Sequence, residues 1–185
     1  ERGTLEPLLA TPVSRNELVA GKYLTVVLTS VVASVIALLG MYAAFYIKPD
    51  ALLDSGTGAR FSISWVNALL IVGVATLLAG FFGALELALS TFARSFREAQ
   101  SYLSPLSIAV VIPGVFLQFV DPSEVASVLY MVPLVNGIFV FKEILLNSVD
   151  WRHVAMMALS SLVWISLGLK VATNLFRKES VLFRS

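Results

Sequence analysis

Cysteine is absent from this sequence of 185 residues, and the single histidine lies at position 153. The missing cysteines exclude disulfides, thiolate metal sites and thiol-based catalysis within the chain. Charged residues make up 14% of the chain, against about 25% in a typical soluble domain, and the net charge of +1 gives no basis for a nucleic-acid-binding surface. The sequence also lacks a GxxxxGK[ST] motif, so a P-loop ATP site is excluded.

Apolar residues are present in excess of what a core of this size needs. They form 58% of the chain, and the mean hydropathy is +0.87. The surplus must face lipid, where an unpaired peptide group costs several kcal/mol, so the spanning segments must be helices. We therefore predict an all-α, polytopic transmembrane helical bundle, organised as a single transmembrane domain over residues 1–185.

Four apolar stretches are long enough to cross a bilayer, which takes about 20 residues. The predicted spans are residues 23–47, 61–92, 99–120 and 154–176. His153 precedes the last span beside Trp151 and Arg152, where we expect it to anchor the chain at the membrane interface.

A fifth apolar stretch, residues 125–146, is interrupted by polar and helix-breaking residues. These are Pro133, Asn136, Gly137, Lys142 and Glu143. The uninterrupted part is too short to span, so we predict a re-entrant or interfacial helical hairpin. The alternative is a true span with a functional kink.

Lysine and arginine in the loops predict the orientation. With the start of the chain in the cytoplasm, eight basic residues lie on the cytoplasmic side (Arg2, Arg15, Lys22, Arg94, Arg97, Arg177, Lys178 and Arg184). Four lie outside (Lys48, Arg60, Lys142 and Arg152). This count places both ends of the chain in the cytoplasm and requires that residues 125–146 do not cross.

The first 22 residues predict a short surface helix, a sharp turn and a long helix entering the membrane. Thr4 is placed to cap the short helix, and Thr11-Pro12 breaks the chain. The sequence from Ser14 to Glu17 forms a capping box, so the long helix should begin near Ser14 and continue past Lys22. The short helix is either an interfacial anchor or a docking surface for a cytoplasmic partner.

The residues Glu-Arg-Gly-Thr-Leu-Glu-Pro-Leu-Leu-Ala-Thr-Pro-Val-Ser-Arg at 1–15, followed by Glu17 and Gly21-Lys22, resemble the cytoplasmic loop of ABC-type-2 transporter permeases. The closest subgroup is the NatB-like, sodium-efflux permeases, and the ending from Leu175 to Arg184 is similar to the end of that family after its last span. The resemblance implies that the loop is a coupling helix between the second and third spans. The chain would then be a C-terminal fragment that lacks two spans.

The resemblance also implies a function. The chain would be the permease subunit of an exporter in the plasma (inner) membrane, paired with a second permease subunit as a homo- or heterodimer. It would not be an enzyme and would hold no cofactor, because ATP would be bound by a separate ABC ATPase subunit. The implied ATPase-coupling residues are Leu5, Glu6, Leu8, Leu9, Arg15 and Glu17.

Two charges lie well inside the predicted spans, Glu86 and Lys170. Each lies seven or eight residues from a cytoplasmic arginine, so both are about 10–12 Å deep. An intramembrane ion pair would lower the cost of burying them. The alternative is that Lys170 extends to the headgroups and Glu86 is neutral or hydrated.

Pro105 and the pair Pro113-Gly114 interrupt the hydrogen bonding of the third span and are possible gate hinges, with a static kink as the alternative. Ala75, Ala79 and Gly83 recur every four residues and predict close helix packing. From the residues alone, two other functions stay open. One is a gradient-driven secondary transporter or channel, and the other is a membrane scaffold that transports nothing.

Overall fold

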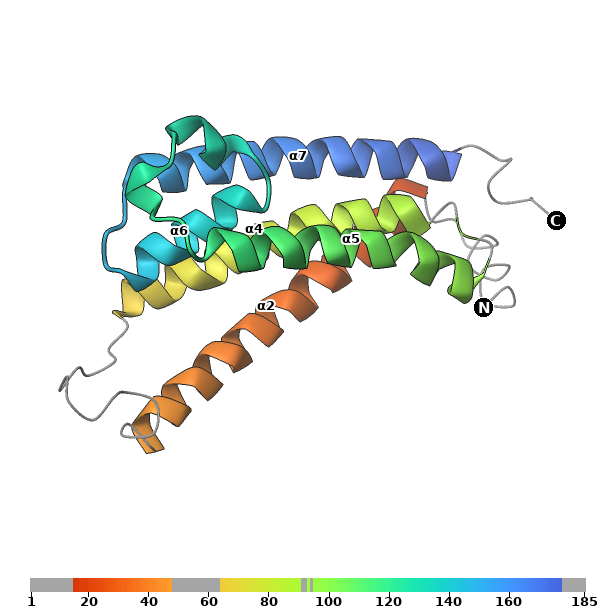
Figure 1. Cartoon of the computed structure of the whole chain (residues 1–185). Helices are drawn as coiled ribbons and strands as arrows, with labels where there is room; N and C mark the ends of the chain where they lie inside the picture. The colour runs from red at the N-terminus through yellow and green to blue at the C-terminus, as the bar shows by residue number, and fades with distance from the viewer. Residues whose placement is uncertain (1–14, 48–63, 91–92, 94, 178–185) are drawn as a thin grey trace.

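The computed structural model describes residues 15–47, 64–90, 93 and 95–177. Within these ranges the secondary structure is helical, and two 3-10 turns lie between the fifth and sixth α-helices of the labelling in Figure 1. The elements are α2 (Arg15–Ile47), α4 (Trp65–Ser90), α5 (Phe96–Leu117), η1 (Pro122–Glu124), η2 (Ser127–Met131), α6 (Val135–Leu145) and α7 (Trp151–Arg177). The predicted all-α fold is confirmed.

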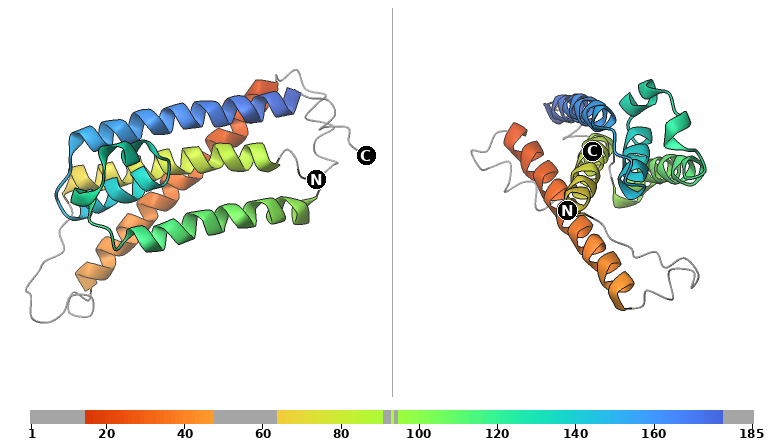
Figure 2. Two further views of the ribbon diagram at one scale, coloured as in Figure 1. Left: turned by 45° about the horizontal axis from the view of Figure 1, so that its top comes forward. Right: turned by 90° about the vertical axis from the view of Figure 1, so that its left-hand side faces the viewer.

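Helix α4 lies at the centre of the bundle. It packs along α7, is crossed obliquely by α2, and has α5 on its other side (Figures 1 and 2). The start of α2 and the end of α7 lie at the same end of the bundle (Figure 1). Four described helices, α2, α4, α5 and α7, are long and apolar enough to cross a membrane. The predicted number of spans is therefore confirmed.

Small residues allow α4 to approach its neighbours closely. A Cβ added at Gly83 would lie 3.0 Å from a methyl carbon of Val26 on α2, so the predicted contact of the small-residue stripe is made at this position. A Cβ added at Gly168 of α7 would lie 2.9 Å from the Cβ of Ala84, which is fully buried. Such contacts bring helix backbones together where apolar burial gives no drive for association.

Helix α6 has 11 residues and is about 16 Å long at 1.5 Å per residue, against about 30 Å for the hydrocarbon core. It lies at the end of the bundle where α4 and α7 begin and α5 ends (Figures 1 and 2). Its buried face joins Tyr130 of η2 and Met157 of α7 in the hydrophobic core cluster. The prediction of a short helical segment that does not span is confirmed.

Two helices begin about three residues earlier than the sequence predicts, because each has a polar cap. The side chain of Ser95 accepts a hydrogen bond from the Glu98 amide at 3.2 Å, so α5 starts at Phe96. The carboxylate of Asp150 accepts from the Arg152 amide at 2.8 Å, and α7 starts at Trp151. Helix α2 begins at Arg15 and runs unbroken past Lys22, as the capping box predicts.

The outer surfaces of the bundle are apolar. No residue in the most apolar part of α2 or α5 is buried, as expected of helices that face lipid or other membrane segments. Trp65, Phe119 and Trp151 are exposed near the ends of α4, α5 and α7 that surround α6. Exposed aromatic residues near the ends of membrane helices are typical of a membrane interface.

Candidate functional site

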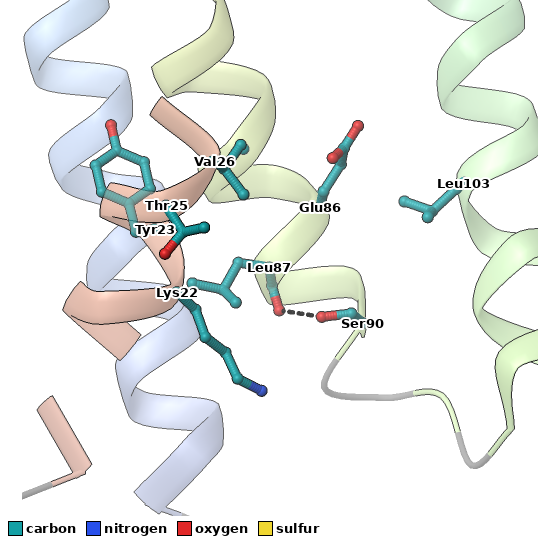
Figure 3. Close-up of a pocket in the computed structure, with 9 residues that line it drawn as sticks. Lys22, Tyr23, Thr25, Val26, Glu86, Leu87, Ser90 and Leu103 are labelled. Carbon is teal, nitrogen blue, oxygen red and sulfur yellow. Dashed lines mark hydrogen bonds between the residues drawn. The ribbon is translucent and has the colours of Figure 1, made fainter. Parts of the chain in front are cut away.

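The end of the bundle away from α6 contains a pocket between α2, α4 and α5. It has a volume of about 410 Å³ and is lined by apolar side chains and by Lys22, Thr25, Glu86 and Ser90. Leu103 of α5 faces it across from Glu86 (Figure 3). The Thr25 and Ser90 hydroxyls donate to carbonyls of their own helices at 2.9 Å, so Glu86 and Lys22 supply the formal charge of the lining.

Glu86 and Lys170 are both exposed, and within the described residues they do not form an ion pair with each other. The Glu86 side chain extends from α4 toward Leu103 of α5 (Figure 3), whereas Lys170 belongs to α7. The predicted pairing between the second and fourth spans is therefore not made in this arrangement of the helices. The ion pair stays a prediction.

Four of the predicted ATPase-coupling residues, Leu5, Glu6, Leu8 and Leu9, lie outside the described residues. Arg15 is the first residue of α2, and Glu17 lies in its first turn. An acidic residue in the first turn is favoured by the helix dipole. Glu17 lies five residues before Lys22, at the end of α2 that borders the pocket.

The candidate hinge residues all lie within α5, which is helical throughout Phe96–Leu117. Pro105 lies two residues beyond the pocket residue Leu103, and Pro113 and Gly114 lie near the other end of the helix. Each proline removes a backbone N–H from the ladder, so these positions are the weakest points of the helix. Their role as hinges stays a prediction.

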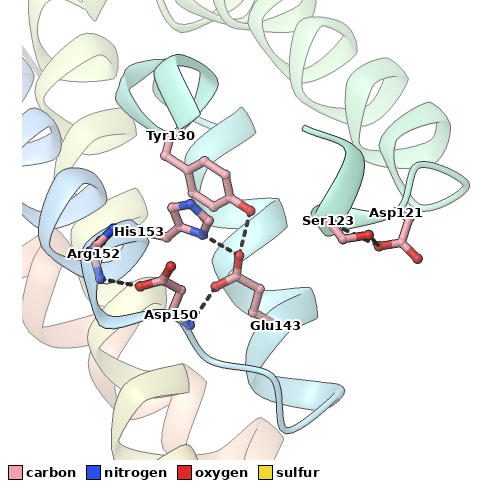
Figure 4. Close-up of polar contacts among 7 residues, drawn as sticks. All are labelled: Asp121, Ser123, Tyr130, Glu143, Asp150, Arg152 and His153. Carbon is pink, nitrogen blue, oxygen red and sulfur yellow. Dashed lines mark hydrogen bonds and ion pairs between the residues drawn. The ribbon is translucent and has the colours of Figure 1, made fainter. Parts of the chain in front are cut away.

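The opposite end of the bundle contains a buried polar cluster centred on Glu143, whose exposed fraction is 4%. One carboxylate oxygen, Oε1, accepts from the Tyr130 hydroxyl at 2.6 Å and contacts His153 Nδ1 at 2.7 Å. The other, Oε2, accepts from the Asp150 amide at 3.2 Å (Figure 4). These contacts join η2, α6 and the start of α7 through a single carboxylate.

The aromatic rings reinforce the cluster. The His153 ring stacks on that of Tyr130, with centroids 3.7 Å apart and planes inclined by 13°. Burial, the hydrogen bond to Glu143 and the negative charges of Glu143 and Asp150 raise the pKa of Tyr130 well above its ordinary value. Tyr130 is therefore a neutral hydrogen-bond donor to Glu143 at physiological pH.

Lys142, adjacent to Glu143 on α6, points to a different partner. Its ammonium donates to the carbonyl oxygens of Leu117 at 3.3 Å and Gln118 at 3.0 Å, and also to that of Val120. These carbonyls belong to the C-terminal end of α5 and to the residues just after it. A helix leaves its last carbonyls unpaired, and the negative end of its dipole favours a cation there.

Sequence reasoning did not identify this cluster. It treated Lys142 and Glu143 as interruptions of an apolar stretch and His153 as an interface anchor, whereas the structure places His153 partly buried against Glu143 and Tyr130. The available signal was an acidic residue in an apolar stretch ten positions before the single histidine. Among the residues that the structure describes, no three or more of His, Cys, Asp and Glu are grouped to hold a metal ion.

Comparisons with known proteins complete this description. A family model described as ABC-2 family transporter protein matches residues 1–170. The chain is also 30% identical over 186 residues to the ABC transporter permease protein NatB of Bacillus subtilis (strain 168), and the alignment covers 97% of this chain. The chain spans 46% of the length of that relative. No solved structure matches the chain.

Proposed function

Because this chain belongs to the ABC-2 family of transporter proteins, we propose that it is part of a permease subunit that couples ATP hydrolysis by a separate ATPase to export of a substrate. The family match over residues 1–170 carries this proposal, since it includes the entry segment, three of the candidate spans in full and most of the fourth. Within the proposal the chain holds no ATP itself, and it assembles with an ABC ATPase and a second permease subunit.

The coupling path begins in the segment of residues 4–17. In the proposal, Leu5, Glu6, Leu8 and Leu9 contact the ATPase, and Arg15 and Glu17 fix the entry into α2. Helix α2 has 33 residues and is about 50 Å long, so a displacement at its first turn is carried by a rigid rod across the bilayer. The pocket between α2, α4 and α5 is the first space whose shape such a displacement would alter.

Two permease halves would enclose the transport pathway and alternate between inward-open and outward-open arrangements as rigid bodies. In the proposed orientation, the first turn of α2 and the pocket face the cytoplasm, and the cluster around Glu143 faces outward. The excess of basic residues on the first side supports this orientation. The exposed aromatic residues at the opposite end, Trp65, Phe119 and Trp151, support a membrane interface there.

The test is co-purification of the full-length permease with its partner from membranes, comparing the wild type with a variant carrying Leu8→Asp and Leu9→Asp. We expect an ATPase subunit to co-purify with the wild type and to be lost in the variant, because two carboxylates disrupt an apolar contact. The matched control is Ser95→Asp, since aspartate also caps a helix and the change adds negative charge at the N-terminal end of α5.

The control should retain the ATPase, and its ATP hydrolysis in proteoliposomes should match that of the wild type. A permease that purifies without an ATPase, whether or not Leu8 and Leu9 are replaced, would contradict the proposal. The function would then be that of a gradient-driven transporter or channel, or of a scaffold. Substrate flux driven by an ion gradient in the purified protein separates these two.

A further inference from the structure

Two adjacent residues of α6 bind two different helices. Lys142 binds the C-terminal end of α5, and Glu143 binds η2 and the start of α7. On an α-helix, successive side chains point in directions about 100° apart. Helix α6 therefore lies between α5 and α7 and contacts each with one charged side chain.

The contacts of Glu143 fix the position of α6 relative to η2 and α7. The carboxylate is buried, and each of its oxygens accepts at least one hydrogen bond (Figure 4). Tyr130 is itself fully buried and is stacked on His153, so the carboxylate meets rigid partners. Hydrogen bonds to a buried charge are among the strongest in proteins. These hydrogen bonds therefore fix α6 relative to α7.

The contacts of Lys142 matter because α5 buries less of its surface in the bundle than its neighbours α4 and α6 do. None of the 22 residues of α5 is buried, in contrast to α4 and α6, which each contribute six buried residues. At its N-terminal end α5 borders the pocket through Leu103, where no side chain of α5 is packed into the core. The ammonium at the other end binds three carbonyls at once.

We propose that α6 is a clasp in which the positioning residues Lys142 and Glu143 hold the end of α5 at a fixed spacing from α7, so that α5 pivots about this end while its other end moves. The clasp rests on the proposed transport function for its role, but its geometry does not depend on that function. The clasp also suggests a role for Pro105 as the hinge of α5, because this residue lies between the pocket end of the helix and the end that Lys142 holds.

The test uses spin-label distances in the full-length permease with its ATPase, in lipid nanodiscs. The chain has no cysteine, so label pairs require only introduced residues here and replacement of any cysteine elsewhere in the subunit. Val115→Cys with Leu159→Cys reports the clasp end, and Ser101→Cys with Asn174→Cys reports the pocket end. All four positions are exposed and lie on α5 or α7.

In the wild type we expect a narrow clasp-end distribution that stays the same with and without ATP, and a pocket-end distance that shifts when ATP is added. Lys142→Met should broaden the clasp-end distribution and reduce the ATP-dependent shift at the pocket end. Lys142→Arg should restore both, because arginine also donates to several carbonyls. A purely packing role for this side chain would not distinguish methionine from arginine in this way.

A clasp-end distribution in Lys142→Met that matches the wild type would overturn the clasp. If Lys142→Met does not fold, Tyr130→Phe replaces it, since it removes one hydrogen bond from the other side of the clasp without changing the ring. An unchanged clasp-end distribution in that variant would overturn the clasp as well. If the clasp end responds as expected but ATP shifts neither distance, the clasp stands and the proposed ATP coupling fails.

Discussion

The contact between Gly168 and Ala84 gives the sharpest prediction about the bundle. A Cβ at position 168 would lie 2.9 Å from the Ala84 Cβ, whereas carbon atoms in contact prefer about 3.5–4.0 Å. Ala84 has no rotatable side chain, and atoms of its backbone lie 3.7 and 3.9 Å from the same point. In Gly168→Ala, α4 and α7 must therefore move apart by roughly 1 Å at this contact.

The expected change in the free energy of unfolding follows from two opposing terms. Overpacking of this kind costs about 1–3 kcal/mol, and alanine is favoured over glycine within a helix by up to about 1 kcal/mol. Gly73→Ala on α4 isolates the second term, because nothing lies within 4 Å of a Cβ at that position. We expect Gly168→Ala to be less stable than Gly73→Ala by about 2 kcal/mol.

The assay is unfolding of the purified full-length permease in mixed micelles, followed by circular dichroism as sodium dodecyl sulfate is increased. Combining Gly168→Ala with Ala84→Gly removes the clash, and the double variant should recover part of the lost stability. A coupling of about 0.5–3 kcal/mol is usual for residues in contact. Equal stability of the Gly168→Ala and Gly73→Ala variants would refute the close approach of α4 and α7.

Three further predictions concern the polar residues. Tyr130→Phe should destabilise the protein by about 1–3 kcal/mol in the same assay, because Glu143 stays buried with one donor fewer; unchanged stability would show that the bond contributes nothing. Folding raises the pKa of Tyr130, so the stability that its neutral hydroxyl contributes is complete below the ordinary tyrosine pKa of 10.0 and is lost as the pH rises beyond that value. The free energy of unfolding of the wild type should therefore fall more steeply above pH 10 than that of Tyr130→Phe. Parallel pH profiles of the two proteins would contradict this. The effects of Glu86→Gln and Lys170→Met on the free energy of unfolding of the subunit alone should be additive, because the two residues form no ion pair here. A coupling energy above about 0.5 kcal/mol in the complex with the ATPase would show that assembly brings the two side chains together.

The spans were predictable because lipid imposes a strong and local condition on the sequence. A helix that crosses a bilayer needs about 20 apolar residues in succession, and this signal requires no knowledge of tertiary contacts. The helix ends were less accurate, since they depend on single caps such as Ser95 and Asp150. The serine and glutamate at positions 95 and 98 have the spacing of a capping box, so that start was visible in the sequence.

The cluster around Glu143 was not predictable in the same way. Its carboxylate contacts side chains 13 residues before it and 10 residues after it. Irregular segments separate these residues, so helical periodicity does not predict that they meet. The ion pair proposed for Glu86 and Lys170 rested on equal depth alone, which permits a contact but does not set the direction of either side chain. Depth follows from sequence, whereas the rotation of each helix about its axis follows from packing at positions such as Gly83 and Gly168.

The same cluster bears on why residues 125–146 form a 3-10 turn and the short helix α6 rather than an additional, kinked crossing between α5 and α7. A span over these residues would carry Lys142 and Glu143 into lipid, where each charge is costly unless it is paired. In the observed fold, the chain turns sharply at Leu134, whose φ of 72° is unusual for a residue with a side chain, and α6 begins directly after it. That strain costs about 1–3 kcal/mol, but the turn brings Glu143 to Tyr130 and His153 and brings Lys142 to the carbonyls of α5. The hydrogen bonds gained by Lys142 and Glu143 therefore offset the strained turn and favour the observed fold over a crossing.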